Sequence, residues 1–284
     1  MKTPLRYPGG KSRAVKHILP YIPEDCGKLC SPFLGGGSIE LAVAERKGTT
    51  AVYGYDLFEP VVWFWQAMLS DPATLTASIK KLRSTYTIKE KGVQKQVEGL
   101  SKDDFAQLRK DLKKVLKDKT GFSYDNAAKF FAINRSSFSG ATFSGGWSKK
   151  ASYARFNDSS IGRVENFKES KLKVKCADFK KSIAQHQDAF LYCDPPYFLG
   201  KDRDRLYGIN GSTHVGFDHA ALYDILSQRG EWVLSYNNCE EIRDLYKGHE
   251  IIEASWAYGM KNVSKESRGN KEMGKSSEII IIGK

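Results

Sequence analysis

The sequence lacks the features of membrane, secreted and metal-binding proteins. No apolar run approaches the roughly 20 residues that cross a bilayer, and the start, Met-Lys-Thr-Pro, has no apolar segment typical of a signal peptide. The five cysteines are scattered, with no Cys-x-x-Cys pair, so we expect reduced thiols and no metal site. These absences predict a cytoplasmic protein, and 284 residues suffice for one large α/β domain with an insertion or for two domains.

Positive charge is concentrated in the middle of the chain. The formal net charge is +12, and residues 80–175 carry 23 Lys and Arg against 10 Asp and Glu, so the remainder is close to neutral. A solvated helical face over residues 102–119 accounts for part of this excess. A near-neutral body with one strongly basic segment also resembles the electrostatic footprint of a nucleic-acid-binding protein.

The N-terminal part has the order strand, glycine loop, helix, strand. Residues 28–33 predict a strand, residues 34–38 a glycine loop and residues 39–44 a helix. A second predicted strand, residues 51–55, ends at Asp56, where a carboxylate can accept both hydroxyls of a ribose. Because the loop is not of the Gly-x-Gly-x-x-Gly type, a nucleoside ligand fits better than a nicotinamide cofactor.

This alternation stops at about residue 79 and returns at about residue 170. The segment between them predicts basic helices and a loop rich in small residues, and we interpret it as an inserted module. Further strands are then predicted at residues 173–176, 189–193, 232–235, 250–253 and 278–282. The last two are expected to pair as a hairpin at one edge of the sheet, because too few residues separate them for a helical crossover.

Residues 194–197, Asp-Pro-Pro-Tyr, directly follow the apolar strand at 189–193. The two prolines have fixed φ and no N–H, so they hold Asp194 in a stiff turn at the strand end. An exocyclic amine can donate one hydrogen to Asp194 and one to the carbonyl of Pro195, while the ring of Tyr197 stacks on the base. This arrangement suits an enzyme that takes a nucleotide out of a duplex.

Several motifs, taken in order, resemble those of the DNA adenine-N6 methyltransferases of the Dam type, the D12 class. Residues 7–11 (Tyr-Pro-Gly-Gly-Lys) are similar to the opening cofactor motif of that family, and residues 32–38 to its Pro-Phe-x-Gly-x-Gly-Ser loop. Asp178 and Phe179 are similar to the pair that contacts the adenine of the cofactor, and residues 194–197 to the catalytic signature. The match covers nearly the whole chain.

The resemblance implies a fold, a reaction and a set of site residues. The fold is α/β, with a Rossmann-like, seven-stranded, mostly parallel sheet and an antiparallel last strand. A helical target-recognition domain at residues 79–169 is inserted into a methyltransferase domain at residues 1–78 and 170–284. The reaction is methyl transfer from S-adenosylmethionine to adenine N6 at specific sites in duplex DNA, by base flipping and without a metal. The implied catalytic residues are Asp194, Pro195 and Tyr197, and the implied cofactor residues are Tyr7, Gly10, Lys11, Phe33, Gly35, Gly37, Asp56, Asp178 and Phe179.

The insert departs from the family pattern. Where well-known members carry Asn-Arg-Tyr-Gly-Tyr-Asn-Gly, residues 134–140 read Asn-Arg-Ser-Ser-Phe-Ser-Gly, so recognition of GATC does not follow. Cations, amides and aromatics suit phosphate contacts and wedging between bases. The residues expected to bind DNA, with the protein as a monomer or weak homodimer, are Asn134, Arg135, Phe138, Ser139, Lys149 and Lys150.

Three other functions are compatible with part of this pattern. An RNA adenine methyltransferase can use the same fold and tetrapeptide, but it has less need of a long basic insert. A cytosine-N4 methyltransferase usually carries Ser-Pro-Pro-Tyr, and the absence of a Pro-Cys dipeptide argues against cytosine-C5 transfer through a cysteine adduct. A DNA-binding protein without activity is disfavoured because Asp56, Asp194 and Tyr197 are all present.

Overall fold

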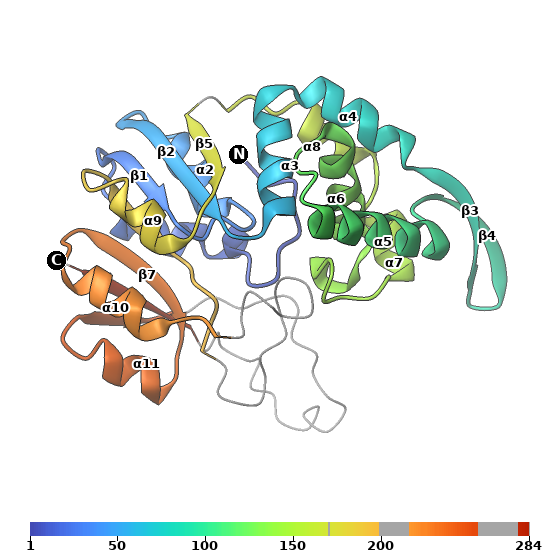
Figure 1. Cartoon of the computed structure of the whole chain (residues 1–284). Coiled ribbons are helices and arrows are strands. Elements are labelled where there is room, and N and C mark those ends of the chain that lie inside the picture. The colour runs from blue at the N-terminus through green and yellow to red at the C-terminus, as the bar shows by residue number, and fades with distance from the viewer. Residues whose placement is uncertain (170, 199–215, 255–277, 284) are drawn as a thin grey trace.

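A computed structural model describes residues 1–169, 171–198, 216–254 and 278–283, and its centre is a seven-stranded sheet (Figure 1). The strand order is β5-β2-β1-β6-β7-β9-β8. β9 runs antiparallel to both β7 and β8, and the other neighbours are parallel, so the predicted sheet is confirmed. The bounds are β1 Gly27–Ser31, β2 Thr49–Asp56, β5 Leu172–Cys176, β6 Phe190–Cys193, β7 Trp232–Asn237, β8 Glu250–Glu253 and β9 Glu278–Gly283.

The last two strands pair antiparallel at one edge of the sheet, as predicted. β9 lies between β7 and β8, so the shorter β8 forms the edge. Four of the six residues of β9 are isoleucines, and Ile279, Ile280 and Ile281 are 0–1% exposed. Such a continuous apolar strand is stable only inside a sheet that is covered on both faces. β8 has a glutamate at each end, and charged residues of this kind are suited to the solvent-exposed edge of a sheet.

Helices cover both faces of the sheet. α9, α10 and α11 lie on the face that is in front in Figure 1, where Ile183, Leu226 and Ile242 pack against strand residues such as Leu191 and Leu234. α2 and α3 belong to the core on the other face. The helix bounds are α1 Val15–Ile18, α2 Ser38–Ala44, α3 Glu59–Ser70, α4 Pro72–Lys81, α5 Lys102–Asp118, α6 Tyr124–Ser136, α7 Lys149–Ala154, α8 Asp158–Glu165, α9 Phe179–Ala184, α10 His219–Ser227 and α11 Glu240–Leu245.

The helices of the basic segment share one core with the sheet. α6 packs against α3, and the ring of Phe131 stacks on that of Phe64 with centroids 5.4 Å apart. Both rings are fully buried, in the same hydrophobic cluster as Leu29 of β1 and Val52 of β2. α3 therefore joins the two parts of the molecule, and it is apolar around most of its circumference because it is covered from both sides.

Residues 11–21 form three short helical pieces, η1 Lys11–Arg13, α1 and η2 Leu19–Tyr21, and Pro20 lies in the last of these. α4 runs through the expected domain boundary at residue 79, and Ile79 is fully buried. None of the described helices is long and apolar enough to cross a membrane.

The insert also contains a hairpin where only helices and loops were expected. β3 (Ser84–Glu90) pairs antiparallel with β4 (Val93–Gly99) in a separate two-stranded sheet that projects at the right of Figure 1. Lys91 and Gly92 form the turn, with φ of 49° and 87°. Positive φ at both central positions matches the twist of a hairpin, which is why a two-residue turn closes it.

Candidate active site

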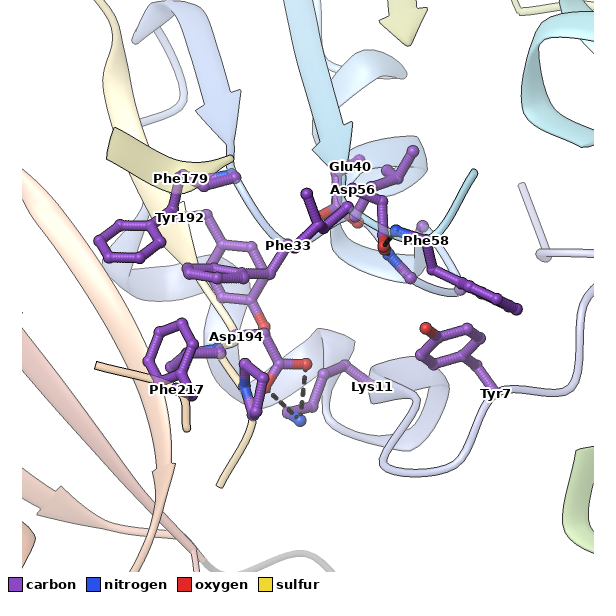
Figure 2. A pocket seen from close by; sticks show the side chains of 18 of the residues that line it. Tyr7, Lys11, Phe33, Glu40, Asp56, Phe58, Phe179, Tyr192, Asp194 and Phe217 are labelled. Atoms are coloured by element: carbon purple, nitrogen blue, oxygen red, sulfur yellow. Dashed lines mark hydrogen bonds and ion pairs between the residues drawn. The ribbon is translucent and has the colours of Figure 1, made fainter. Parts of the chain in front are cut away.

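A cavity of about 320 Å³ lies at the carboxyl ends of β1, β2 and β6 (Figure 2). Every residue predicted for catalysis or cofactor binding contributes to its lining. The fold brings these residues together from five separate segments of the chain, four of which follow a strand. Clefts at this end of a parallel sheet are where doubly wound proteins bind ligands.

Asp194 follows β6 and is bound by a buried lysine. The ammonium of Lys11 lies 2.7 Å from Oδ1 and 2.8 Å from Oδ2 of Asp194, as Figure 2 shows. It also donates to the carbonyl of Gly9 at 2.9 Å and to the hydroxyl of Tyr197 at 2.8 Å. Lys11 is 4% exposed, and its three hydrogens are engaged by the protein. A contact between Lys11 and the carboxylate of a cofactor therefore does not fit this arrangement.

The carboxylate of Asp194 retains acceptor capacity. Oδ1 is buried and lies 2.7 Å from the ammonium of Lys11, and each carboxylate oxygen can accept more than one hydrogen bond. Burial, and to a lesser extent nearby Glu278, raises the pKa of Asp194 to about 6, although Lys11 opposes the shift. A group with this pKa is largely ionised at neutral pH, so it can accept a hydrogen from a bound amine.

Tyr197 is fixed at both its hydroxyl and its ring. The hydroxyl donates to Oε1 of Glu278 at 2.6 Å while it accepts from Lys11, and the ring stacks on Tyr236 with centroids 5.9 Å apart. Glu278 begins β9, is 5% exposed, and lies 4.0 Å from the ammonium of Lys11. Glu278 was not predicted, although a carboxylate at the start of a run of isoleucines is an available signal.

The glycine loop after β1 is held against Asp56. Oδ2 of Asp56 accepts from the backbone N–H of Gly35 at 2.9 Å, and Oδ1 accepts from that of Phe58 at 2.8 Å. Burial raises the pKa of Asp56 to about 6, although these bonds oppose the shift. Gly35 and Gly37 have φ of 44° and 66°, and an added Cβ would lie 2.8 Å from the ring of Tyr7 or 2.5 Å from that of Trp65. Glycine is thus required at both positions.

Three phenylalanines form an aromatic wall in the same cavity. The ring centroid of Phe33 is 5.8 Å from that of Phe179 and 5.6 Å from that of Phe217, and the latter two rings are 5.4 Å apart. Asp178 caps α9 by accepting from the backbone N–H of Lys180 at 2.8 Å. Phe217 was not predicted, because no short motif marks it.

Glu40 is a second site residue that the sequence analysis missed. It lies on α2, lines the cavity and is 2% exposed. Its Oε1 accepts from the hydroxyl of Ser31 at 2.5 Å, and burial raises its pKa to about 7. The signal was a glutamate within the apolar helix predicted over residues 39–44. Of the described residues, no group of His, Cys, Asp and Glu side chains is arranged to hold a metal ion.

The residues expected to bind DNA lie outside the cavity, and two of them have internal partners. The Asn134 amide is fully buried, donates to the carbonyls of Arg6 at 2.6 Å and Gly140 at 3.1 Å, and accepts from the N–H of Arg6 at 2.9 Å. Arg135 is 6% exposed and donates to the carbonyls of Arg155 at 2.7 Å and Pro4 at 3.1 Å. Neither side chain fits the expected role of a surface contact to DNA.

The other four residues of this set are accessible. Phe138 is 55% exposed, so its ring does not pack inside the insert. Its backbone N–H donates to the carbonyl of Gly146 at 2.9 Å, which fixes the loop that presents the ring. Ser139 has φ of 55°, and Lys149 and Lys150 are exposed, with the ammonium of Lys149 donating to the carbonyl of Lys89.

Comparison with known proteins gives one family and several relatives. The family model of D12 class N6 adenine-specific DNA methyltransferases matches residues 7–260. A Type II methyltransferase of Lactococcus lactis subsp. cremoris, M1.LlaDCHI, is 25% identical over 97% of this chain and 93% of its own length. DNA adenine methylases from two strains of Vibrio cholerae serotype O1 are 26% identical over 87% of this chain and 85% of theirs.

Proposed function

The chain belongs to the D12 class N6 adenine-specific DNA methyltransferases, and we propose that it transfers the methyl group of S-adenosylmethionine to adenine N6 of a base flipped out of duplex DNA. Residues 79–169 are proposed to hold the DNA and residues 1–78 and 170–284 to bind the cofactor. The observation that carries the proposal is the Asp194 carboxylate. It is buried at a strand end, lines the cavity, and is paired with Lys11 through both of its oxygens.

The proposed role of Asp194 follows from the chemistry of an exocyclic amine. The lone pair of adenine N6 is delocalised into the ring, so the nitrogen is a poor nucleophile until its hydrogens are held and its developing charge is offset. A carboxylate that accepts one of these hydrogens stabilises a positive nitrogen more than a neutral one, so it lowers the barrier. The carbonyl of Pro195 is proposed to accept the other hydrogen. Lys11 keeps Asp194 ionised and oriented without contacting the base.

The lining of the cavity fits S-adenosylmethionine. The aromatic wall of Phe33, Phe179 and Phe217 offers stacking surfaces for an adenine, and the carboxylate of Asp56 is a suitable acceptor for ribose hydroxyls. The bound cofactor supplies a methyl group on a positively charged sulfur. Asp194 and Asp56 lie at different parts of one cavity, so methyl transfer needs positioning of the two substrates and no residue that acts as a nucleophile.

The test compares two isosteric variants that separate the roles of the two carboxylates. Asp194→Asn should reduce turnover at least a hundredfold, through loss of a charge-assisted hydrogen bond worth about 1.5–3 kcal/mol and of the partner of Lys11, while cofactor affinity stays within a few-fold of wild type. Asp56→Asn should weaken S-adenosylmethionine about ten- to a hundredfold and change turnover at saturation much less.

Turnover is measured with labelled cofactor on duplex DNA, with the product identified as N6-methyladenine, and affinity by calorimetry. The same assay on structured RNA tests the RNA alternative. Activity of Asp194→Asn within a few-fold of wild type would sink the proposed mechanism, and methylcytosine as product would overturn the proposed target atom.

A further inference from the structure

A second cavity, of about 650 Å³, adjoins the active site and is lined by cations. It shares Tyr7, Gly10, Gly36 and Ser38 with the first cavity, so only the glycine loop and the N-terminal segment separate the two. The cationic residues in its lining come from the N-terminal segment and from α6, α7–α8 and their connection: Lys2, Arg6, Arg13, Arg135, Arg155 and Arg163. No aspartate or glutamate is among the residues found to line it.

Four of these guanidiniums lack a carboxylate partner among the residues that the structure describes. Within the described part of the chain, Arg6, Arg135, Arg155 and Arg163 form no ion pair. Arg6 donates to the carbonyl of Ser137 at 3.2 Å, and Arg135 donates to backbone carbonyls, all of them neutral acceptors. The exposed side chains of Arg155 and Arg163 form no hydrogen bond with any other described residue.

The positive charges of these arginines repel one another. Burial, and to a lesser extent repulsion from Arg6, Arg163 and Arg155, lowers the pKa of Arg135 to about 9. The pKa of Arg6 is lowered in the same way, by burial and then by Arg155. Such a cluster of cations without anionic partners does not stabilise the fold, because burying an unpaired charge costs free energy. An anion that enters the cavity supplies that partner.

Phosphate groups match this cavity best. The planar guanidinium pairs with phosphate oxygens through two parallel hydrogen bonds, and several arginines around one space can hold more than one phosphate. The walls come from both parts of the protein, and the cavity borders the residues that contact Asp194 and the glycine loop. The cavity therefore adjoins the position proposed for the target base, and the phosphates next to that base are the nearest anionic groups of the DNA.

We propose that this arginine cavity binds backbone phosphates of the methylated DNA strand next to the target nucleotide, with the exposed Arg155 and Arg163 as the contacts, while the half-buried Arg6 and the buried Arg135 add positive charge. The proposal rests on the function proposed above. It moves the expected phosphate contact of the insert from single surface residues to a cavity formed jointly with the N-terminal segment.

The test uses the two exposed arginines, since their removal breaks no hydrogen bond to a described residue. Duplex DNA binding is measured across a range of salt concentrations for wild type, Arg155→Ala/Arg163→Ala, and Arg155→Lys/Arg163→Lys. The alanine pair should weaken binding about ten- to a hundredfold, and flatten the slope of log affinity against log salt by about 2, at roughly 0.9 per lost phosphate contact. The lysine pair should restore most of the slope, because it restores the charge.

The matched control is Lys181→Ala/Lys247→Ala, which removes the same charge from exposed positions on α9 and just after α11, elements that lie on the opposite side of the molecule from α5 and α7 in Figure 1. It should leave the slope unchanged. Melting temperature and S-adenosylmethionine affinity are measured for every variant to confirm that the fold is intact. An alanine pair that is folded and has the slope of wild type overturns the proposal.

A separate titration with inorganic phosphate and with pyrophosphate distinguishes a backbone phosphate from a free one. Pyrophosphate should compete with DNA for wild type but not for the alanine pair. If the alanine pair loses pyrophosphate yet binds DNA like wild type, the cavity serves a free anion and the DNA assignment is wrong. Formation of N6-methyladenine by wild type is scored independently, so failure of the proposed function is distinguishable from failure of this inference.

Discussion

Lys11 and Asp194 set the pH range in which the site can work. Asp194 accepts an amine hydrogen only when ionised, and its pKa is about 6 because burial raises it more than Lys11 lowers it. Turnover should therefore rise about tenfold per pH unit below this value and level off above it. Removing the cation with Lys11→Met should shift the midpoint upward by about one to three units, the usual effect of losing an opposite charge in contact.

The measurement is turnover at saturating DNA and cofactor between pH 5 and 9 for wild type, Lys11→Met and, as a control, Lys180→Met. Lys180 is an exposed lysine of the same cavity and should not move the midpoint. A Lys11→Met profile with the wild-type midpoint contradicts the assigned pair.

Tyr197 carries more than a stacking surface. Its hydroxyl connects Lys11 to Glu278, so Tyr197→Phe leaves a buried donor and a buried acceptor without their partner. We expect a loss of turnover of about ten- to a hundredfold, which differs from the small loss expected for stacking alone. Glu278→Gln keeps an acceptor for the hydroxyl and should be milder. Since Glu278 raises the pKa of Asp194, this variant should also shift the pH midpoint downward.

Turnover and pH profile are measured together for these variants, with Glu241→Gln on the exposed side of α11 as the control. Full activity of Tyr197→Phe would show that the hydroxyl network is structural only. An unchanged midpoint for Glu278→Gln would remove Glu278 from the electrostatics of Asp194.

At the scale of elements, local patterns were predictable and distant pairings were not. The strand, loop and helix over residues 28–44 follow from alternation and glycine, and all the predicted cofactor and catalytic residues line one cavity. The contact of Lys11 with Asp194 joins residues 183 positions apart, so no local pattern contains it. The β3–β4 hairpin was missed because its turn is Lys91-Gly92, where asparagine or aspartate before the glycine would have been the recognisable signal.

Glu40, on α2, makes the free energy of unfolding depend on pH. Its pKa is about 7 in the folded protein and its ordinary value is 4.5, so the folded state binds the proton more tightly than the unfolded chain. The contribution is fully favourable below about pH 4.5 and is lost as pH rises through about 7. Glu40→Gln should remove this decline and be more stable than wild type at pH 8 by about 1–3 kcal/mol, at about 1.4 kcal/mol per pKa unit.

Chemical denaturation of wild type and Glu40→Gln at pH 5 and pH 8 measures the difference, with Glu231→Gln at an exposed position as the control. Asp194 and Asp56 contribute with the same sign, so the informative quantity is the gap between the two proteins, which should widen with pH. A gap that is equal at both pH values contradicts a raised pKa at Glu40.

Across the whole molecule, the basic segment and the sheet are tied together by more than their shared core. The Asn134 amide on α6 holds the backbone N–H and carbonyl of Arg6, in the N-terminal segment that leads directly to Tyr7 and Lys11. Gly140, the third partner, has φ of 76°, and an added Cβ there would lie 2.1 Å from the carbonyl oxygen of Arg6. The insert is thus attached to the N-terminal segment that leads into the active site. Asn134 was expected to contact DNA because its side chain is polar and belongs to a basic segment. Its burial instead gives it an internal, structural role.

Asn134→Ala should therefore lower the stability of the protein and leave its intrinsic affinity for DNA unchanged. It leaves three buried hydrogen-bonding partners unsatisfied, and a cost of about 2–4 kcal/mol is expected from such groups. For a chain of this size that corresponds to a fall in melting temperature of roughly 5–15 °C. Asn166→Ala, which removes an exposed amide with one bond to Gly162, should lower it by roughly 2 °C or less. At a temperature where Asn134→Ala is folded, the salt dependence of DNA binding should match wild type, because no phosphate contact is lost. A variant that melts like wild type but binds DNA poorly would instead return Asn134 to the DNA interface.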